Sequence, residues 1–163
     1  RIRGLILMAL SNKFRWMVLS TGNKTELALG YCTLYGDMSG GLSVISDLNK
    51  IEVYRLAEWI NEKMGPRIPI NSINKMPSAE LAKDQFDPFD YEIISPLVDR
   101  VVENHPSKKE MVEQGFNKES VDLVKDKIQM NEYKRKQAAP GLKISSKAFG
   151  MGRRYPIVNH YMD

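Results

Sequence analysis

The most restrictive feature of this sequence is a short apolar run that ends in a polar turn and leads into a helical pattern. The run is Trp16-Met17-Val18-Leu19-Ser20, and Thr21-Gly22-Asn23 follows it. Unbroken hydrophobicity over a few residues is typical of a strand buried on both faces of a parallel sheet. Because parallel strands are joined by helical crossovers, the pattern predicts an α/β layer.

Helical patterns lie on both sides of this run. Residues 2–12 are dense enough in apolar side chains for a helix buried on most sides. After the turn, Asn23 can cap a helix, and Glu26 stands three residues further on, as in a capping box. The expected inner face of this helix is Leu27, Ala28, Tyr31 and Leu34.

The next segments predict one more strand and one more helix before the pattern changes. Residues 35–41 read as a loop, Val44-Ile45 as a stub of strand, and Lys50 to Lys63 as an amphipathic helix ended by Pro66. Its expected inward side chains are Val53, Leu56, Ala57, Ile60 and Met64. Two strands are too few for a whole sheet, so the remaining strands are expected before Arg1.

Prolines interrupt the chain from Pro66 to Pro96, which predicts a loop-rich stretch. Helices are then expected at about 97–104 and 118–131, with a short one at 108–114. Residues 138–155 are rich in glycine and basic side chains and predict an ordered or induced-fit arm. We therefore divide the chain into residues 1–65, the remainder of an α/β nucleotide-binding layer, and residues 66–163, a loop-rich and helical region with a basic C-terminal arm.

Composition excludes some classes of protein and leaves others open. The net charge is +4, but residues 131–163 hold seven Lys/Arg against two acids. Such a tail could meet nucleic acid, a membrane surface or a phosphorylated small molecule, or could simply be solvated. No apolar run approaches the roughly 20 residues of a membrane span. A single cysteine, Cys32, cannot form an internal disulfide, which fits a reduced, cytoplasmic protein.

The turn after the first strand is where chemistry is expected. In open α/β sheets, ligands bind at the carboxyl ends of the strands. Thr21 and Glu26 are therefore candidates for contacting a nucleotide and its magnesium ion. Asn23 and Glu26 would look the same if they only capped a helix, and spacing alone favours that simpler interpretation.

A series of motifs in fixed order supplies the missing context. This series closely resembles NAD synthetases, members of the N-type ATP pyrophosphatases, over nearly all 163 residues, and its end is similar to the tail of the long, glutamine-using forms. Its motifs are Ser20-Thr21-Gly22-Asn23-Lys24-Thr25-Glu26, Gly30-Tyr31-Cys32-Thr33-Leu34-Tyr35-Gly36-Asp37, Asp47-Leu48-Asn49-Lys50, Pro77-Ser78-Ala79-Glu80-Leu81, Asn131-Glu132-Tyr133-Lys134-Arg135, Gly141-Leu142-Lys143 and Ala148-Phe149-Gly150-Met151-Gly152-Arg153-Arg154.

The resemblance implies a partial Rossmann-like fold of the adenine nucleotide alpha hydrolase type and a two-step reaction. The nicotinate carboxylate of deamido-NAD attacks the α-phosphate of ATP, and ammonia, supplied from glutamine by a separate domain, converts the acyl adenylate to the amide. In these roles Glu26 would hold Mg²⁺, Lys50 and Ser78 would contact phosphate oxygens, and Thr21 would contact ATP. Such cations and donors oppose the charge that grows on departing pyrophosphate.

The resemblance also implies roles for other residues. Arg1 falls where the family has an ATP-contacting arginine, Asp37 would bind deamido-NAD, and Tyr31 would pack near the nicotinate ring. Lys134 matches a basic tripeptide that closes over the substrate. Each residue also has a simpler interpretation: Tyr31 as core, Lys50 and Lys134 as solvated surface. Asp47 is expected to be a helix N-terminal acid. The family implies a homo-oligomer without nucleic-acid or membrane partners.

Two departures from the family pattern stand out. Leu34 occupies a position where ammonia-dependent members often have a lysine that holds the substrate. The signature loop Ser-Gly-Gly-x-Asp-Ser, which cradles pyrophosphate with backbone N–H groups, is also missing. Residues 39–43 resemble it superficially but lack the aspartate, and we assign them to the substrate-side loop. Because the sequence begins at Arg1 rather than Met, we expect a piece of a longer protein whose true signature lies upstream.

Two alternative functions remain open. Other amidotransferases of the same superfamily would share the ATP-handling residues but should lack the Tyr35-Gly36-Asp37 and Lys134 pattern. A non-catalytic module that binds nucleic acid through the basic tail would need aromatic residues for base stacking. Phe149 and Tyr155 give that alternative thin support.

Overall fold

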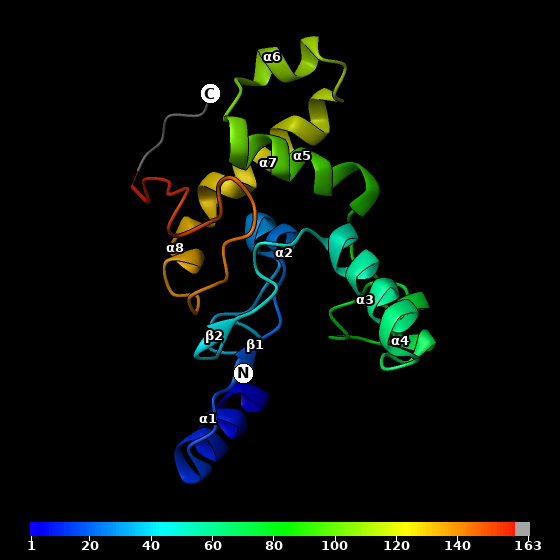
Figure 1. Cartoon of the computed structure of the whole chain (residues 1–163). Coiled ribbons are helices and arrows are strands. Elements are labelled where there is room, and N and C mark those ends of the chain that lie inside the picture. Colours follow the sequence, from blue (N-terminus) through cyan, green and yellow to red (C-terminus); the bar gives the residue numbers. More distant parts are fainter. Residues whose placement is uncertain (159–163) are drawn as a thin grey trace.

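A computed structural model describes residues 1–158 and shows helices arranged around a small pair of parallel strands (Figure 1). The α/β class and the mostly helical C-terminal region are therefore as predicted. The elements are α1 (Ile2–Phe14), β1 (Leu19–Ser20), α2 (Lys24–Leu29), β2 (Leu42–Ser43), α3 (Lys50–Met64), α4 (Ile70–Asn74), α5 (Tyr91–Asn104), α6 (Lys108–Glu113), α7 (Lys118–Met130) and α8 (Glu132–Arg135).

The two strands pair in parallel, with Leu19 opposite Leu42 and Ser20 opposite Ser43. The predicted strand at Val44-Ile45 is wrong by two residues, and residues 42–43 are strand rather than loop. Gly40 makes this pairing possible, since a Cβ there would lie 2.9 Å from the backbone N of Ser20. Burial of the first strand was also overestimated, because Trp16 and Met17 are exposed and only Ser20 is buried.

Helix α2 begins as predicted and ends earlier. Asn23 and Glu26 form the capping box, with the Asn23 side chain accepting from the Glu26 N–H. Gly30 then adopts a left-handed conformation with φ 67° and stops the helix. Tyr31 and Leu34 therefore follow the helix rather than completing its inner face, although Tyr31 still packs against the core.

The remaining helices confirm the predictions at 50–63, 108–114 and 118–131. Helix α3 is more exposed than its pattern implied, with Leu56 and Met64 both open to solvent. Helix α5 starts at Tyr91 instead of residue 97, because Asp90 caps it and Pro96 is accommodated inside it. Helix α4 lies in the stretch that was predicted to be loop.

One hydrophobic core joins the early and late parts of the chain. It consists of Ala28, Leu29, Ile94, Leu97, Val98, Val101, Val102, Met111, Val121, Val124 and Ile128. Short α2 therefore packs between α5 and α7. Arg135 reinforces this contact, because its buried guanidinium donates to the carbonyls of Leu27 and Ala28 in α2 and of Ile128 in α7.

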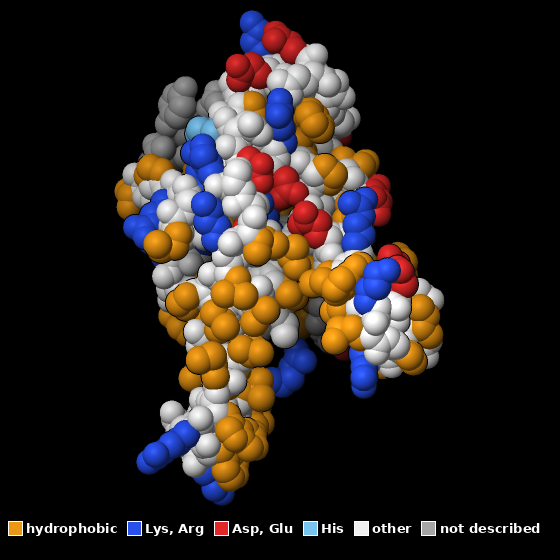
Figure 2. Space-filling view, viewed as in Figure 1, with side chains coloured by type: hydrophobic (Ala, Val, Ile, Leu, Met, Phe, Trp, Pro, Cys, Tyr) orange, Lys and Arg blue, Asp and Glu red, His pale blue; other side chains and the backbone are white. Residues whose placement is uncertain are grey.

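Helix α1 extends away from this core (Figure 1). Its predicted burial is wrong for this structure: only Gly4 is buried, and Ile2, Leu5 and Ile6 are exposed. Gly4 packs closely against the chain, since an added Cβ would lie 2.9 and 3.0 Å from the carbonyls of Tyr35 and Gly36, whereas the large apolar side chains of α1 face outward. Figure 2 shows hydrophobic side chains gathered over α1 and the strand pair, and most charged side chains elsewhere.

Residues 138–155, hereafter the arm, form no helix, as predicted. The arm passes β2, where Ser43 donates its N–H to the Pro140 carbonyl, and Gly141 bridges to Ser43. Further on, Phe149 stacks on the guanidinium of Arg135 at 4.5 Å, and Arg153 donates to the Val102 carbonyl at the end of α5. A cavity of about 500 Å³ lies between the arm and α8.

Candidate functional site

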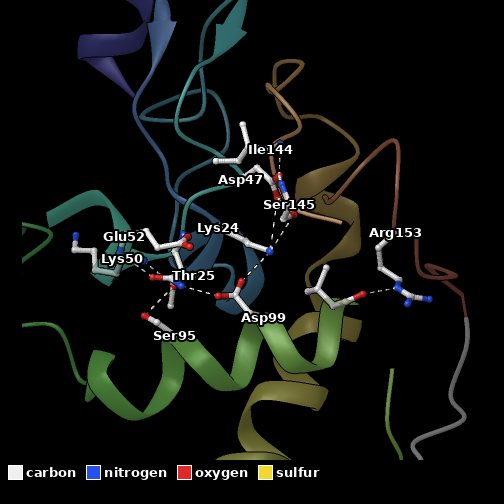
Figure 3. Close-up of polar contacts among 12 residues, drawn as sticks. Lys24, Thr25, Asp47, Lys50, Glu52, Ser95, Asp99, Ile144, Ser145 and Arg153 are labelled. Carbon is white, nitrogen blue, oxygen red and sulfur yellow. Dashed lines mark hydrogen bonds and ion pairs between the residues drawn. The ribbon is translucent and has the colours of Figure 1, made fainter. Parts of the chain in front are cut away.

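The site forms where two helices begin side by side. Helices α2 and α3 follow the carboxyl ends of β1 and β2, and the Lys24 N–H donates to the Leu48 carbonyl at 2.7 Å. Helix α5 supports both beginnings, because Ser95 accepts from the Thr25 hydroxyl and Asp99 accepts from Asn49. Thr25 in turn accepts the backbone N–H of Lys50 at 3.1 Å (Figure 3). This frame fixes the first turns of the two helices relative to each other.

Glu26 and Lys50 meet in this frame. The Lys50 Nζ lies 2.9 Å from Glu26 Oε1, and the side chains are only 18% and 20% exposed. Lys50 also lies 5.4 Å from the centre of the Tyr91 ring. The structure therefore brings together two of the predicted site residues, and it removes the interpretation of Lys50 as a fully solvated first-turn residue.

Tyr31 and Tyr91 complete one wall around Asp87. The Tyr91 hydroxyl donates to Asp87 Oδ2 at 2.7 Å. The buried Tyr31 hydroxyl and Asp87 Oδ1 lie near each other, but neither makes a hydrogen bond of normal length within residues 1–158. Burial first, then Asp87, raises the pKa of both tyrosines, so their hydroxyls remain donors at neutral pH. Unpaired buried polar atoms beside Glu26 and Lys50 are what a polar ligand would satisfy.

The loop after α2 gathers three further predicted residues. Asp37 Oδ1 accepts the Thr33 N–H, Arg1 donates to the Leu34 carbonyl, and Lys134 donates to the carbonyls of Gly30 and Cys32. Lys134 is thus held against the loop by its ammonium rather than projecting into solvent. Burial raises the pKa of the Cys32 thiol in this loop to about 11, so it stays protonated.

No hydrogen bond among residues 1–158 joins Thr21 or Ser78 to the Glu26–Lys50 pair. Thr21 is exposed at the start of the turn. The Ser78 hydroxyl closes its own loop, donating to the Gln85 carbonyl and accepting from the Glu80 N–H. Their roles toward ATP remain predictions.

Sequence reasoning missed a buried network next to the site. Lys24, 1% exposed, lies 2.8 Å from Asp99 and 3.7 Å from Asp47. Asp47 accepts the N–H groups of Ile144 and Ser145 and the Ser145 hydroxyl, all from the arm. Asp47 is therefore not a helix N-terminal acid; it holds the arm. Ser95, a polar residue in the apolar stripe of α5, was the one signal that a polar contact lies on this face, although its own partner is Thr25.

Electrostatics explain why Asp47 can be buried. Burial by itself would raise the pKa of this carboxyl, but the hydrogen bonds from Ser145 and Ile144, together with Lys24, lower it below its ordinary value. Asp47 therefore remains ionised and keeps Lys24 paired. Within residues 1–158, no group of three or more His, Cys, Asp or Glu side chains is placed to hold a metal ion. None of the helices described is long and apolar enough to span a membrane.

The frame of two helix N-termini at the carboxyl edge of parallel strands defines an α/β protein of the ligand-binding type. A solved structure with this fold is a glutamine-dependent NAD(+) synthetase from Cytophaga hutchinsonii, with a TM-score of 0.73 and 19% identity over 97% of this chain and 27% of that one. The family described as NAD synthase matches residues 1–138, and the chain belongs to this family.

Curated relatives agree in sequence. A glutamine-dependent NAD(+) synthetase from Synechocystis is 47% identical over 99% of this chain, and one from Thermotoga maritima is 48% identical over all of it. In both comparisons the chain spans only 29% of the relative's length. The resemblance inferred from the motifs is therefore confirmed, whereas the activity of a complete enzyme is a matter for proposal.

Proposed function

We propose that this chain is the C-terminal part of the synthetase region of an enzyme that amidates deamido-NAD at the expense of ATP, with ammonia released from glutamine elsewhere in the enzyme. The observation that carries the proposal is the Glu26–Lys50 pair, held at the carboxyl edge of the strands between two helix N-termini. A fixed, part-buried cation is suited to charge that develops on departing pyrophosphate, because it needs no reorganisation during the reaction.

The residues divide into two sides in this proposal. On the ATP side, Lys50 would contact phosphate oxygens, with Thr21, Ser78 and Arg1 as further contacts. Glu26 would be one carboxylate ligand of Mg²⁺, which fits an ion that keeps most of its waters and takes one or two carboxylates. The present pairing with Lys50 holds that carboxylate in place.

On the substrate side, Asp37, Tyr31 and Lys134 would bind deamido-NAD. The Tyr31 hydroxyl supports this assignment, because it is buried beside Asp87 and makes no hydrogen bond of normal length within the described residues. Lys134 already has two carbonyl partners, so its part in binding would be to keep the loop at residues 30–37 closed. The same proposal places residues 1–65 with the nucleotide-binding layer and residues 66–163 with the helical region and arm.

The two sides can be separated by one experiment in a synthetase that carries this chain. Asp37→Ala should weaken deamido-NAD binding, measured by calorimetry, and leave ATP affinity nearly unchanged. The exposed Glu58→Ala, within α3, is a control for loss of an acid. Equal weakening of both ligands by Asp37→Ala would contradict the assignment. Binding of an oligonucleotide in a gel shift, without binding of deamido-NAD, would instead favour the basic-module alternative.

Three features implied by the resemblance belong to the same proposal: a homo-oligomeric assembly, a cytoplasmic location and a signature loop supplied by a segment outside this sequence. Sedimentation of the purified protein measures the first directly. A single monomeric species at micromolar concentration would remove it from the proposal.

A further inference from the structure

The arm reaches the candidate site through a chain of polar contacts that are buried or partly buried. Ser145 bonds to Asp47 through both its N–H and its hydroxyl, at 2.7 and 2.8 Å. Asp47 in turn faces Lys24, and the Lys24 Nζ also lies 3.4 Å from the Ser145 hydroxyl. In Figure 3 the Lys24 side chain lies between Asp47 and Ser145 on one side and Asp99 of α5 on the other.

Lys24 stands at the first position of α2, two residues before Glu26. Its ammonium is held by acids from the segment before α3 and from α5, the same elements that fix Lys50 and Thr25. Loss of the arm would remove the hydrogen bonds that Ile144 and Ser145 donate to Asp47. The Asp47 carboxylate, which pairs with Lys24, would then be held less firmly. The first turn of α2, and therefore the Glu26 carboxylate, would then lose part of its anchorage.

We propose that Lys24, Asp47 and Ser145 are positioning residues, through which the docked arm holds Glu26 against Lys50. This inference rests on the proposed function for its catalytic consequence, but the structural coupling stands by itself. None of the three touches the Glu26–Lys50 pair directly, so their effect passes through the backbone of α2 and the segment preceding α3.

The structural part is tested on the 163-residue chain by amide hydrogen exchange. Ser145→Ala removes the hydroxyl bond, and Asp47→Asn removes the charge while keeping the size of the side chain. Both should speed exchange at residues 24–27 and at Lys50, by about tenfold, the scale of one hydrogen bond to a charged group. Ser146→Ala is the matched control, since Ser146 follows Ser145 directly in the arm and its side chain is exposed. Unchanged exchange in both test variants would overturn the inference.

The catalytic part is tested in a synthetase that carries the chain. Ser145→Ala and Asp47→Asn should lower kcat for amide formation about tenfold with little change in the KM for deamido-NAD, because they disturb position rather than contact. Ser145→Thr, which keeps a hydroxyl, should restore kcat. If exchange is altered in these variants but kcat is normal in them and also in Lys50→Ala, the structural coupling stands and the proposed function is rejected. A normal kcat only in the arm variants would reject the positioning role.

Discussion

At the scale of single residues, Lys50 and Glu26 give the sharpest test of the site. Lys50→Ala should lower kcat much more than it raises the KM for deamido-NAD, by on the order of 3 kcal/mol in activation free energy, because the lost cation opposes charge that grows in the transition state. Steady-state kinetics of a synthetase carrying the chain measure both constants.

Lys63→Ala is the control for this variant. Lys63 lies near the other end of α3, where it pairs with Glu62 and is 54% exposed, so its loss should leave both constants unchanged. A Lys50→Ala enzyme within twofold of wild type would remove Lys50 from the ATP site.

At single residues, local contacts could be predicted from the sequence, whereas contacts between distant positions could not. The capping box of Asn23 and Glu26 was readable because its two members are three positions apart. The same spacing could not show that Glu26 also meets Lys50, which comes 24 positions later from another helix. Nor could it show that Asp47 accepts hydrogen bonds from Ile144 and Ser145. These residues are 97 and 98 positions away, and their contacts with Asp47 depend on how the arm folds back beside β2.

At the scale of elements, the end of α2 is set by Gly30. Its φ is +67°, and a Cβ there would lie 2.0 Å from Asn131 Oδ1. Asn131 bonds the carbonyls of Leu29 and Lys127 and so links the ends of α2 and α7. Gly30→Ala should therefore lower the free energy of unfolding by about 2 to 3 kcal/mol, from backbone strain plus loss of these bonds.

Urea denaturation measures this change, and Gly115→Ala separates its two causes. Gly115 also has a positive φ, +92°, but nothing lies within 4 Å of an added Cβ. Its substitution should cost only the strain, about 1 kcal/mol. Equal losses in the two variants would show that the contact with Asn131 contributes nothing.

The docking of the arm should depend on pH in a defined direction. The folded pKa of Asp47 lies below its ordinary value, so its contribution is fully present above that ordinary value, about 3.9, and is lost as pH falls through the folded pKa. The Ser145 amide shift, followed by NMR, should stay constant from pH 7 to 5 and change only in stronger acid.

Asp47→Asn should abolish that acid transition. Glu80→Gln is the control, because Lys75 lowers the pKa of Glu80 as well, but Glu80 is exposed and far from the arm in sequence. A transition of the Ser145 amide near neutral pH would contradict the assignment to Asp47.

Elements differed in how well they could be predicted. Amphipathic α3 and α7 were found within a residue or two, because their apolar periods and caps are local. Helix α5 begins at Tyr91, six residues before its predicted start, because Asp90 caps it and the helix accommodates Pro96. A proline in the sequence by itself predicts a helix boundary. The burial of α1 was misjudged because an apolar helix gives no information about which surface covers it.

At the scale of the whole molecule, we expect the isolated 163-residue chain to form no NAD from deamido-NAD, ATP, Mg²⁺ and excess ammonia. Residues 1–158 contain two strands of two residues each, and the sequence has no Ser-Gly-Gly-x-Asp-Ser loop, so donors for pyrophosphate would be lacking. A site without them should lose several kcal/mol of transition-state stabilisation. The comparison is NAD formation by this chain and by a protein extended upstream through the loop; comparable turnover would reject our placement of the ATP site.

The guanidinium of Arg135 has a consequence for the order in which the protein is made. It bonds the carbonyl of Leu27, 108 positions earlier. At about 5 to 20 residues per second, the ribosome needs roughly 5 to 20 s to travel that distance. During this interval the end of α2 lacks its partner, and its carbonyls are hydrogen-bonded to water instead. A pause in translation between these codons would lengthen the exposure, so synonymous changes there could alter the yield of folded protein without changing a single side chain.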